Sequence, residues 1–255
     1  MQNYKYILDD STLSEFEKCF YNKYDSTLHP QQPYFDILVN SVNSYTTFLE
    51  IGCGQGRIFK SIRPFVKSYV GLEPDKERYK DCLELFEESN TNHDFYNMFS
   101  HEYLAAYPEK KFDFVCISHV IQHVSTQTAH NILKDAYNLL NVNGKLIVST
   151  TCVPNEIYTY NQNNISDSVI NFDLYCTNNE SYNGLPIHMF AKDTLEKYLH
   201  DSNFTVINYE QYEFIKEKNI PWFSCIFHTS IDRLCSIGMS QVALCIKSEV
   251  KENCI

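Results

Sequence analysis

The stretch that decides the fold is Phe48-Leu49-Glu50-Ile51-Gly52-Cys53-Gly54-Gln55-Gly56-Arg57. The apolar run from Thr46 to Ile51 predicts a buried strand, and the amphipathic run from Arg57 to Val66 predicts a helix. Between them stand three glycines spaced two apart. Because glycine has no Cβ, a strand, a glycine-rich turn and a helix in this order allow the backbone to approach a ligand closely.

An acidic residue follows the glycine turn at a distance that indicates where it lies in the fold. The run Tyr69-Val70-Gly71-Leu72 predicts the next strand, and it ends in Glu73, twenty-one residues after Gly52. An acid about twenty residues past such a turn lies at the tip of the neighbouring strand. There its carboxylate can accept hydrogen bonds from both hydroxyls of a ribose.

Spacing separates two classes of ligand for this turn. The dinucleotide fingerprint is G-x-G-x-x-G, with the pyrophosphate on the helix N-terminus. Here the third glycine comes one residue early and Arg57 occupies the position that the fingerprint needs, which disfavours a nicotinamide oxidoreductase. Glu50 also precedes the first glycine. An acidic loop suits an ammonium group and a cationic sulfur better than it suits phosphates.

The pattern E-x-G-x-G-x-G resembles motif I of the class I S-adenosylmethionine (SAM) dependent methyltransferases. Residues 112–124 resemble the F-D-x-V…H-V block of that family, and residues 139–150 resemble its L-x-x-x-G-x-L-x-x-x-T block. The resemblance covers residues 46–152, with a weaker match at 186–207. It implies SAM as the cofactor and S-adenosylhomocysteine as the product.

Strands alternate with helices through the first part of the chain, which predicts a parallel sheet with ligands at its carboxyl edge. With the resemblance, the expected fold is α/β: a Rossmann-like, doubly wound, mostly parallel seven-stranded sheet with an antiparallel last strand, plus N-terminal helices and two insertions forming a lid. Besides the two strands above, we expect strands at 93–98, 111–118, 145–150, 204–214 and 241–247.

The whole chain, 1–255, is expected to form one methyltransferase domain. Residues 1–45 would form an N-terminal helical lid, with one helix beginning at Ser11 or Thr12 and another over 34–42. Residues 46–152 would form the SAM-binding core. Two aromatic-rich segments, 153–190 and 215–235, are expected as insertions over the acceptor site.

Composition excludes several classes of function. The net charge is −11 and only four arginines are present, which argues against a nucleic-acid partner, because such partners are held mainly by Lys and Arg on phosphates. No signal-peptide core and no run long enough to span a membrane are found, so we expect no membrane association. The ten cysteines form no C-x-x-C pair, which favours a reducing cytoplasm. The oligomeric state is not predicted.

The family resemblance assigns a set of cofactor-binding residues. Glu73 would hold the ribose, Glu50 would lie near the amino group of the methionine moiety, and the glycines would allow the close approach. Asn97 and Ser100, near the end of the third strand, are the candidates for contact with the adenine amino group, and Ser118 ends the fourth strand. The full set is Glu50, Gly52, Cys53, Gly54, Gly56, Glu73, Asn97 and Ser118.

Three histidines are candidates for catalysis: His119, His123 and His188. SAM is already activated, so a general base is needed only where the acceptor must lose a proton, and histidine has a suitable pKa. His119 lies one residue beyond the fourth strand. If the segment is helical, His123 projects from the same face. The alternatives are structural histidines, or an H-x-x-x-H metal pair that lacks a third ligand; no metal is predicted.

The sequence therefore predicts a SAM-dependent methyltransferase acting on a small-molecule acceptor, with oxygen slightly preferred over nitrogen as the acceptor atom. The D/N-P-P-Y/F tetrapeptide of base amino-methylating relatives and the Pro-Cys nucleophile of base carbon methylation are both missing. Two alternatives stay open. One is a protein or peptide methyltransferase, and the other is a catalytically silent SAM-binding partner subunit.

Overall fold

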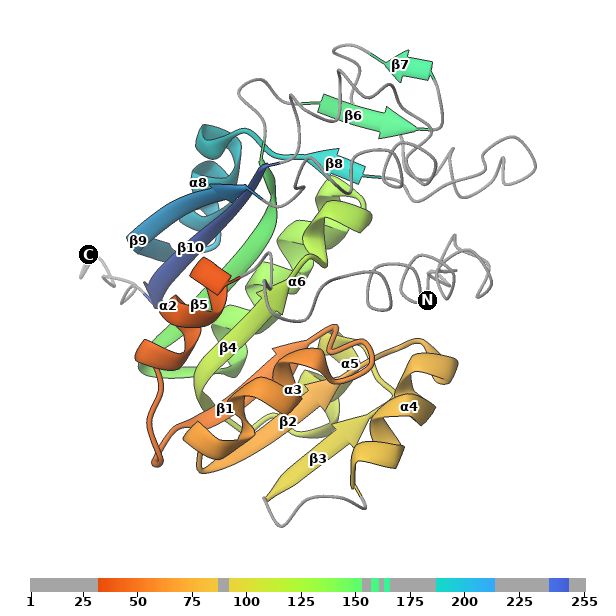
Figure 1. Cartoon of the computed structure of the whole chain (residues 1–255), viewed down its shortest axis with the longest axis vertical. Coiled ribbons are helices and arrows are strands. Elements are labelled where there is room, and N and C mark those ends of the chain that lie inside the picture. The colour runs from red at the N-terminus through yellow and green to blue at the C-terminus, as the bar shows by residue number, and fades with distance from the viewer. Residues whose placement is uncertain are drawn as a thin grey trace, which may run out of the picture.

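The computed structural model describes residues 32–86, 92–152, 157–160, 163–165, 187–213 and 239–247. Its centre is a seven-stranded sheet with the order β3-β2-β1-β4-β5-β10-β9 (Figure 1). The strands are β1 (Thr47–Ile51), β2 (Ser68–Leu72), β3 (His93–Tyr96), β4 (Phe112–Ser118), β5 (Leu140–Cys152), β9 (Phe204–Glu213) and β10 (Met239–Lys247). β3, β2, β1, β4 and β5 pair in parallel, whereas β10 runs antiparallel to both β5 and β9. The predicted fold class is confirmed, including the antiparallel last strand.

Helices cover both faces of this sheet. Helices α2 (Gln32–Asn40), α3 (Arg57–Ile62) and α4 (Lys76–Phe86) pack on one face, and α5 (Ser100–Ala106), α6 (Thr126–Leu139) and α8 (Lys192–Asp201) pack on the other. Alternation along β1 explains both layers, because Phe48 faces the first set and Leu49 faces the second. With both faces covered, the strands read as continuous apolar runs.

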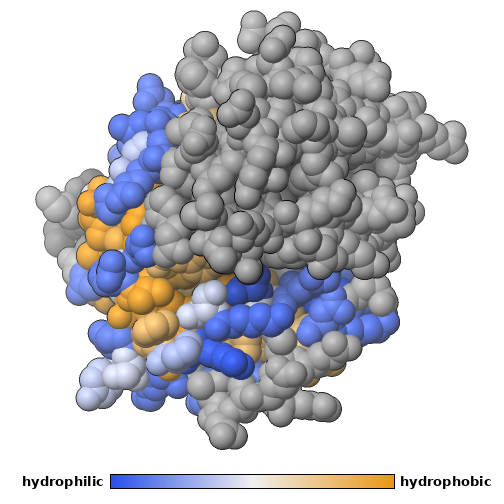
Figure 2. Space-filling view, in the orientation of Figure 1, coloured by the Kyte–Doolittle hydropathy of each residue, from blue (hydrophilic) through white to orange (hydrophobic). Residues whose placement is uncertain are grey.

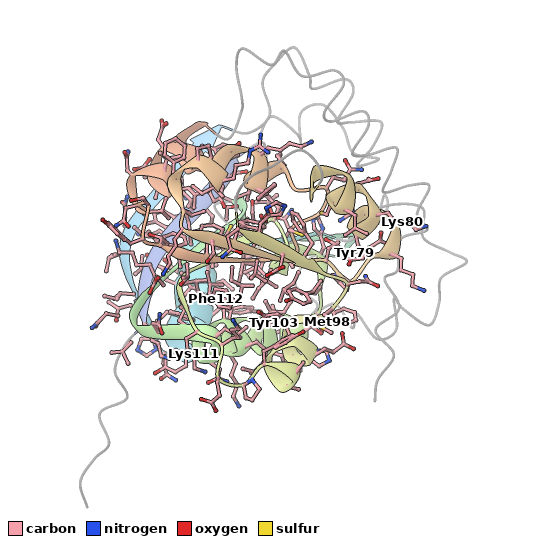
Figure 3. The ribbon with its side chains drawn as sticks, turned by 90° about the horizontal axis from the view of Figure 1, so that it is seen from below. Tyr79, Lys80, Met98, Tyr103, Lys111 and Phe112 are labelled. Carbon is pink, nitrogen blue, oxygen red and sulfur yellow. The ribbon has the colours of Figure 1, made fainter. Side chains whose placement is uncertain are left out.

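Aromatic side chains fill much of both layers. On the α3 face, the Phe48 ring is stacked between Tyr69 and Phe114, with centroid distances of 5.6 and 5.3 Å. On the opposite face, Tyr103 of α5 packs against Phe112 at the start of β4, with the centroids 6.3 Å apart (Figure 3). The space-filling view shows hydrophobic residues at the level of α2 and hydrophilic ones over α4 and α8 (Figure 2).

Several element boundaries differ from the predictions, and three of the differences have a clear place in the fold. The helix predicted over 57–66 ends at Ile62 and continues as the 3₁₀ turn η1 (Arg63–Phe65), because Pro64 has no N–H for the α-helical bond. β3 ends at Tyr96. β5 begins at Leu140, five residues early, and absorbs the predicted turn: Asn143 has φ 61°, and the register against β4 shifts there.

Part of the first predicted insertion forms a second sheet with the order β7-β6-β8, made of β6 (Ile157–Tyr160), β7 (Asn163–Ile165) and β8 (Ile187–Met189). Gln241 of β10 binds the chain on both sides of this sheet: its Nε2 donates to the carbonyl of Thr151 at 3.2 Å and to that of Phe190 at 3.0 Å. The predicted helix at Ser11 or Thr12 and the predicted insertion 215–235 lie outside the described residues.

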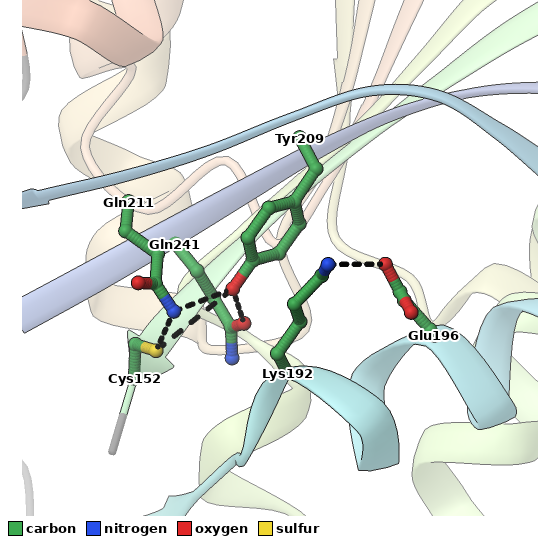
Figure 4. A network of polar contacts seen from close by, with 6 residues as sticks. All are labelled: Cys152, Lys192, Glu196, Tyr209, Gln211 and Gln241. Atoms are coloured by element: carbon green, nitrogen blue, oxygen red, sulfur yellow. Dashed lines mark hydrogen bonds and ion pairs between the residues drawn. The ribbon is translucent and has the colours of Figure 1, made fainter. Parts of the chain in front are cut away.

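Gln241 belongs to a polar network at this junction (Figure 4). The Tyr209 hydroxyl donates to Gln241 Oε1 at 2.7 Å, and Gln211 Nε2 donates to the Tyr209 hydroxyl at 2.8 Å. Lys192 Nζ lies 4.9 Å from the centroid of the Tyr209 ring. The network joins α8, β9 and β10 where the chain leaves and re-enters the main sheet. In the described part of the chain, no helix is long and apolar enough to cross a membrane.

We predict that Phe48→Ala lowers the free energy of unfolding by about 3–5 kcal/mol, because it removes a fully buried ring from between two others. Urea denaturation followed by circular dichroism measures this change. Phe65→Ala is the matched control: that ring is 43% exposed, so its loss should cost far less. Equal costs for the two variants would contradict the packing described for β1.

Candidate active site

The glycine turn follows β1 at the carboxyl edge of the sheet. Gly52, Gly54 and Gly56 all adopt the left-handed conformation, with φ of 74°, 56° and 75°. This conformation is strained for residues with a Cβ. A Cβ on Gly52 would also lie 2.5 Å from Cγ2 of Val120, in the segment after β4. The loops after β1 and β4 therefore touch, at the point where the strand order reverses.

Glu73 lies directly after β2 and is held by the backbone. Its Oε2 accepts a hydrogen bond from the N–H of Gly54 at 2.9 Å, and its Oε1 accepts one from the N–H of Asp75 at 2.9 Å. Burial raises the pKa of Glu73, while Arg78 and these two N–H groups act in the opposite direction. A carboxylate has about four acceptor positions, so two remain for the hydroxyls of a ribose.

Glu50 is buried on the α3 face near the carboxyl end of β1, where it is 2% exposed. The Tyr69 hydroxyl donates a hydrogen bond to Glu50 Oε2. Burial raises the pKa of Glu50 to about 8, although the Tyr69 hydrogen bond and the nearby Arg57 guanidinium favour the ionised form. At neutral pH the group is mostly protonated, and a ligand cation beside it would favour ionisation.

Asn97, just after β3, binds the backbone of the loop after β2. Its Nδ2 donates to the carbonyls of Glu73 and Pro74, both at 2.9 Å. Because both partners are carbonyl oxygens, the amide orientation is defined by chemistry, and Oδ1 is left as the acceptor. An acceptor there suits the amino group of an adenine.

The remaining residues of the predicted cofactor set have other neighbours. Cys53 turns its side chain into the core, with its Sγ 3.8 Å from Cys82 Sγ. Ser118 Oγ lies 3.1 Å from Ser149 Oγ and accepts a hydrogen bond from Arg57 Nη2 at 3.4 Å. The Arg57 guanidinium also lies 5.5 Å from the centroid of the Phe35 ring of α2. Arg57 thus reaches across from the glycine turn to the end of β4.

The segment that carries His119 and His123 is not an α-helix, so the condition for one shared helical face is not met. His119 has a left-handed backbone, with φ 55°, and only Ile121–His123 form a 3₁₀ turn, η2. Both rings instead meet the buried amide of Gln122: His119 Nδ1 lies 3.1 Å from Gln122 Oε1, and His123 Nε2 lies 3.0 Å from Gln122 Nε2. The left-handed residue ends the regular path of β4 and turns the chain back.

Burial lowers the pKa of His119 to about 3, and the nearby Arg57 guanidinium adds to the effect. Its Nε2 is shielded from solvent. At neutral pH His119 is therefore a neutral imidazole. His188 lies in β8, which runs beside η2, so all three candidate histidines are on neighbouring segments; the His188 side chain lies outside the described ones. Among the described residues, no group of three or more His, Cys, Asp and Glu is placed to hold a metal ion.

Two residues of this site were missed by the sequence analysis. Tyr69 has a recognisable signal, because the parallel register pairs it with Phe48 and alternation puts Glu50 on the same face. Gln122 has none beyond its place between two histidines. Its importance comes from a hydrogen bond to the backbone of β5: the N–H of Thr151 donates to Gln122 Oε1 at 2.8 Å.

We predict that Glu50 gives the unfolding free energy a pH dependence of defined sign. Between its usual pKa of 4.5 and about 8, the folded state holds a proton that the unfolded state has lost, so stability falls as pH rises. The slope amounts to at most about 1.4 kcal/mol per pH unit. Glu50→Gln should remove this slope.

Urea denaturation at several pH values from 5 to 8 tests this, with the difference between the wild type and Glu50→Gln as the quantity of interest. Glu102→Gln is the control, because Glu102 is an exposed carboxylate that caps α5. Its curve should run parallel to that of the wild type. Parallel curves for the wild type and Glu50→Gln would contradict the raised pKa.

Comparison with known proteins places the chain in a family. The profile of the methyltransferase-domain family matches residues 8–209. A protein of Alkaliphilus oremlandii named as an uncharacterized methyltransferase is 26% identical over 151 residues, which cover 58% of this chain and 62% of that protein. The chain thus spans about three fifths of the length of this curated relative.

Solved structures agree on the fold. A SAM-dependent methyltransferase of Clostridium acetobutylicum superposes with a TM-score of 0.61 at 11% identity, covering 94% of this chain and 98% of the other. Burkholderia thailandensis 1,6-didemethyltoxoflavin-N1-methyltransferase, solved with bound 1,6-didemethyltoxoflavin and S-adenosylhomocysteine, superposes with a TM-score of 0.57 at 14% identity, covering 94% of this chain and 88% of the other. With the glycine turn and its two acids in place, the chain belongs to the methyltransferase-domain family and has the fold of these SAM-dependent methyltransferases.

Proposed function

We propose that this protein transfers the methyl group of SAM to an oxygen or nitrogen atom of a small-molecule acceptor. The observation that carries the proposal is the contact between Gly52 and Val120. It places the cofactor turn after β1 directly against the segment that carries His119 and His123. A reaction between a group on the turn and a group beside the histidines therefore needs no large movement of either loop.

The chain offers a partner for each part of SAM, which when bound supplies an activated methyl group on a sulfonium. Glu73 has acceptor positions for the ribose hydroxyls, and the Asn97 Oδ1 suits the adenine amino group. Glu50 lies under the turn, where its ionised form would favour the ammonium group of the methionine moiety. The glycines remove the Cβ atoms that would block the approach.

For the acceptor, His119 is our first candidate. With a pKa of about 3 it stays neutral through the physiological range, so its role is to accept the hydrogen bond of an acceptor O–H or N–H and to orient the nucleophile. A base this weak favours an acceptor whose proton leaves late in the transfer. His123 and His188 are the further candidates, since β8 runs beside η2.

Support for a small acceptor comes from the cover over this edge. The β6–β8 sheet is rooted at Cys152 and Phe190, and β8 lies beside η2 and β5. We infer that residues 153–190, with 1–45 and 215–235, form a lid that closes a pocket, which suits a small molecule better than a polypeptide.

The cysteines support a location for the protein. In the described residues the free thiols are Cys53, Cys82, Cys116, Cys152 and Cys245. Free thiols support a reducing, cytoplasmic location.

The direct test of the substrate class uses SAM with a labelled methyl group and the full-length protein. Low-molecular-mass metabolites and the protein fraction of a cell extract are offered separately as acceptors. Label in the first fraction alone supports the proposal, and label in a protein band supports a protein methyltransferase. Binding of S-adenosylhomocysteine with no transfer to either fraction would favour the silent partner subunit.

Glu73→Gln is predicted to weaken S-adenosylhomocysteine binding by about 2 kcal/mol, or about thirtyfold, because charged hydrogen bonds to the ribose are lost. Glutamine keeps one oxygen for a backbone N–H and keeps the shape of the side chain. Isothermal titration calorimetry measures the affinity, and Glu102→Gln, on the surface of α5, should leave it unchanged. An unaltered affinity in Glu73→Gln would refute the ribose assignment.

His119→Asn is predicted to lower turnover about 10²-fold while S-adenosylhomocysteine affinity stays near that of the wild type. Asparagine tolerates the left-handed backbone and can still donate to Gln122, so the variant chiefly removes the distal ring nitrogen. The rate of label transfer to the metabolite fraction is the readout, and His101→Asn, an exposed residue of α5, is the control. A wild-type rate in His119→Asn would remove this histidine from the mechanism.

A further inference from the structure

The Gln122 side chain lies at the centre of the histidine segment and is 4% exposed. Its amide makes three polar contacts within the described residues. Oε1 accepts from the backbone N–H of Thr151 at 2.8 Å and lies 3.1 Å from His119 Nδ1, while Nε2 lies 3.0 Å from His123 Nε2. One buried amide therefore joins β5 to both histidines.

The Thr151 contact defines which end of the amide is which. A backbone N–H can only donate, so the atom it meets must be the carbonyl oxygen of Gln122, and the other end must be the NH₂ group. A flipped amide would direct its NH₂ at this N–H and leave two buried donors facing each other. The strand therefore fixes the amide without reference to either histidine.

The amide in turn defines the protons on the rings. Since Gln122 Oε1 only accepts, His119 must donate from Nδ1, and Nε2 of the neutral ring is unprotonated. Since Gln122 Nε2 donates, His123 must accept at its own Nε2, which places the proton of its neutral form on Nδ1. Both rings are thus held in the same tautomer by the two ends of one side chain.

We propose that Gln122 is a positioning residue that sets the tautomers of His119 and His123, so that His119 presents an unprotonated Nε2 to the methyl acceptor. The proposal rests on the proposed function for its purpose but not for its test. In the opposite tautomer, His119 would offer the acceptor a donor N–H, which cannot take a hydrogen bond from a hydroxyl or an amine. The β5 backbone would thereby determine which acceptors the site can use.

Nitrogen-15 NMR of the full chain, with labelled histidine and bound S-adenosylhomocysteine, reports the protonation of each ring nitrogen. The chain has nine histidines, and His119→Asn and His123→Asn assign the two signals. We expect the Nδ1–H form for both rings in the wild type. An Nε2–H form of His119 would overturn the proposal, and this measurement needs no Gln122 variant to fold.

Gln122→Glu then separates positioning from a purely structural role. A carboxylate still accepts from Thr151 and from His119 Nδ1, but it has no N–H for His123. We therefore expect a proton to appear on His123 Nε2 while His119 is unchanged. Gln127→Glu is the matched control, because Gln127 is an exposed glutamine on α6 that donates to Asn131 Oδ1 at 3.1 Å. It should change neither ring.

Turnover supplies the second readout. If the His119 tautomer serves methyl transfer, Gln122→Met, which keeps the length of the side chain but removes the acceptor for His119 Nδ1, should lower turnover by about tenfold or more with S-adenosylhomocysteine affinity unchanged. An unchanged His123 signal in Gln122→Glu would overturn the assignment of the amide. Predicted tautomers with no methyl transfer in any form of the protein would refute the proposed function and leave the tautomer assignment standing.

Discussion

The close approach of the loops after β1 and β4 is the constraint on which the site depends. A Cβ on Gly52 would overlap Val120, and Gly52 already has a backbone that strains other residues. The parallel pairing of β1 and β4 brings their carboxyl ends together, and the missing side chain lets the two loops touch. Cofactor contacts on one loop and acceptor contacts on the other become parts of one site only because of this approach.

Burial decides how the ionisable groups of this site behave. Glu50 and His119 are both kept mostly neutral at neutral pH, although one is an acid and the other a base, because loss of water disfavours either charge. The Arg57 guanidinium acts on both, favouring ionised Glu50 and disfavouring protonated His119. A ligand cation beside Glu50 would favour the ionised form of this carboxyl group, which suits a cofactor that brings a positive charge with it.

The sequence predicted the fold well because the fold is encoded in local patterns. The glycine turn, the acids at Glu50 and Glu73 and the apolar runs of β1 and β4 each depend on a few consecutive residues or a fixed spacing. The histidine segment was predicted less well. A helix there is plausible from spacing alone, but the left-handed His119 and the short η2 turn result from packing against β5. No local pattern carries that information.

Gln122 is a second case in which the local sequence does not predict the contacts of a residue. Between two histidines its sequence context is unremarkable, and its amide gains meaning only when Thr151, twenty-nine residues later, presents a backbone N–H to it. Strand pairing of β4 with β5 creates that encounter, with Ser118 opposite Ser149 in the register. A polar side chain fixed by main chain in this way has one orientation available. The protons of the neighbouring rings are then determined by the sheet itself, and the reactivity of the segment follows from its topology.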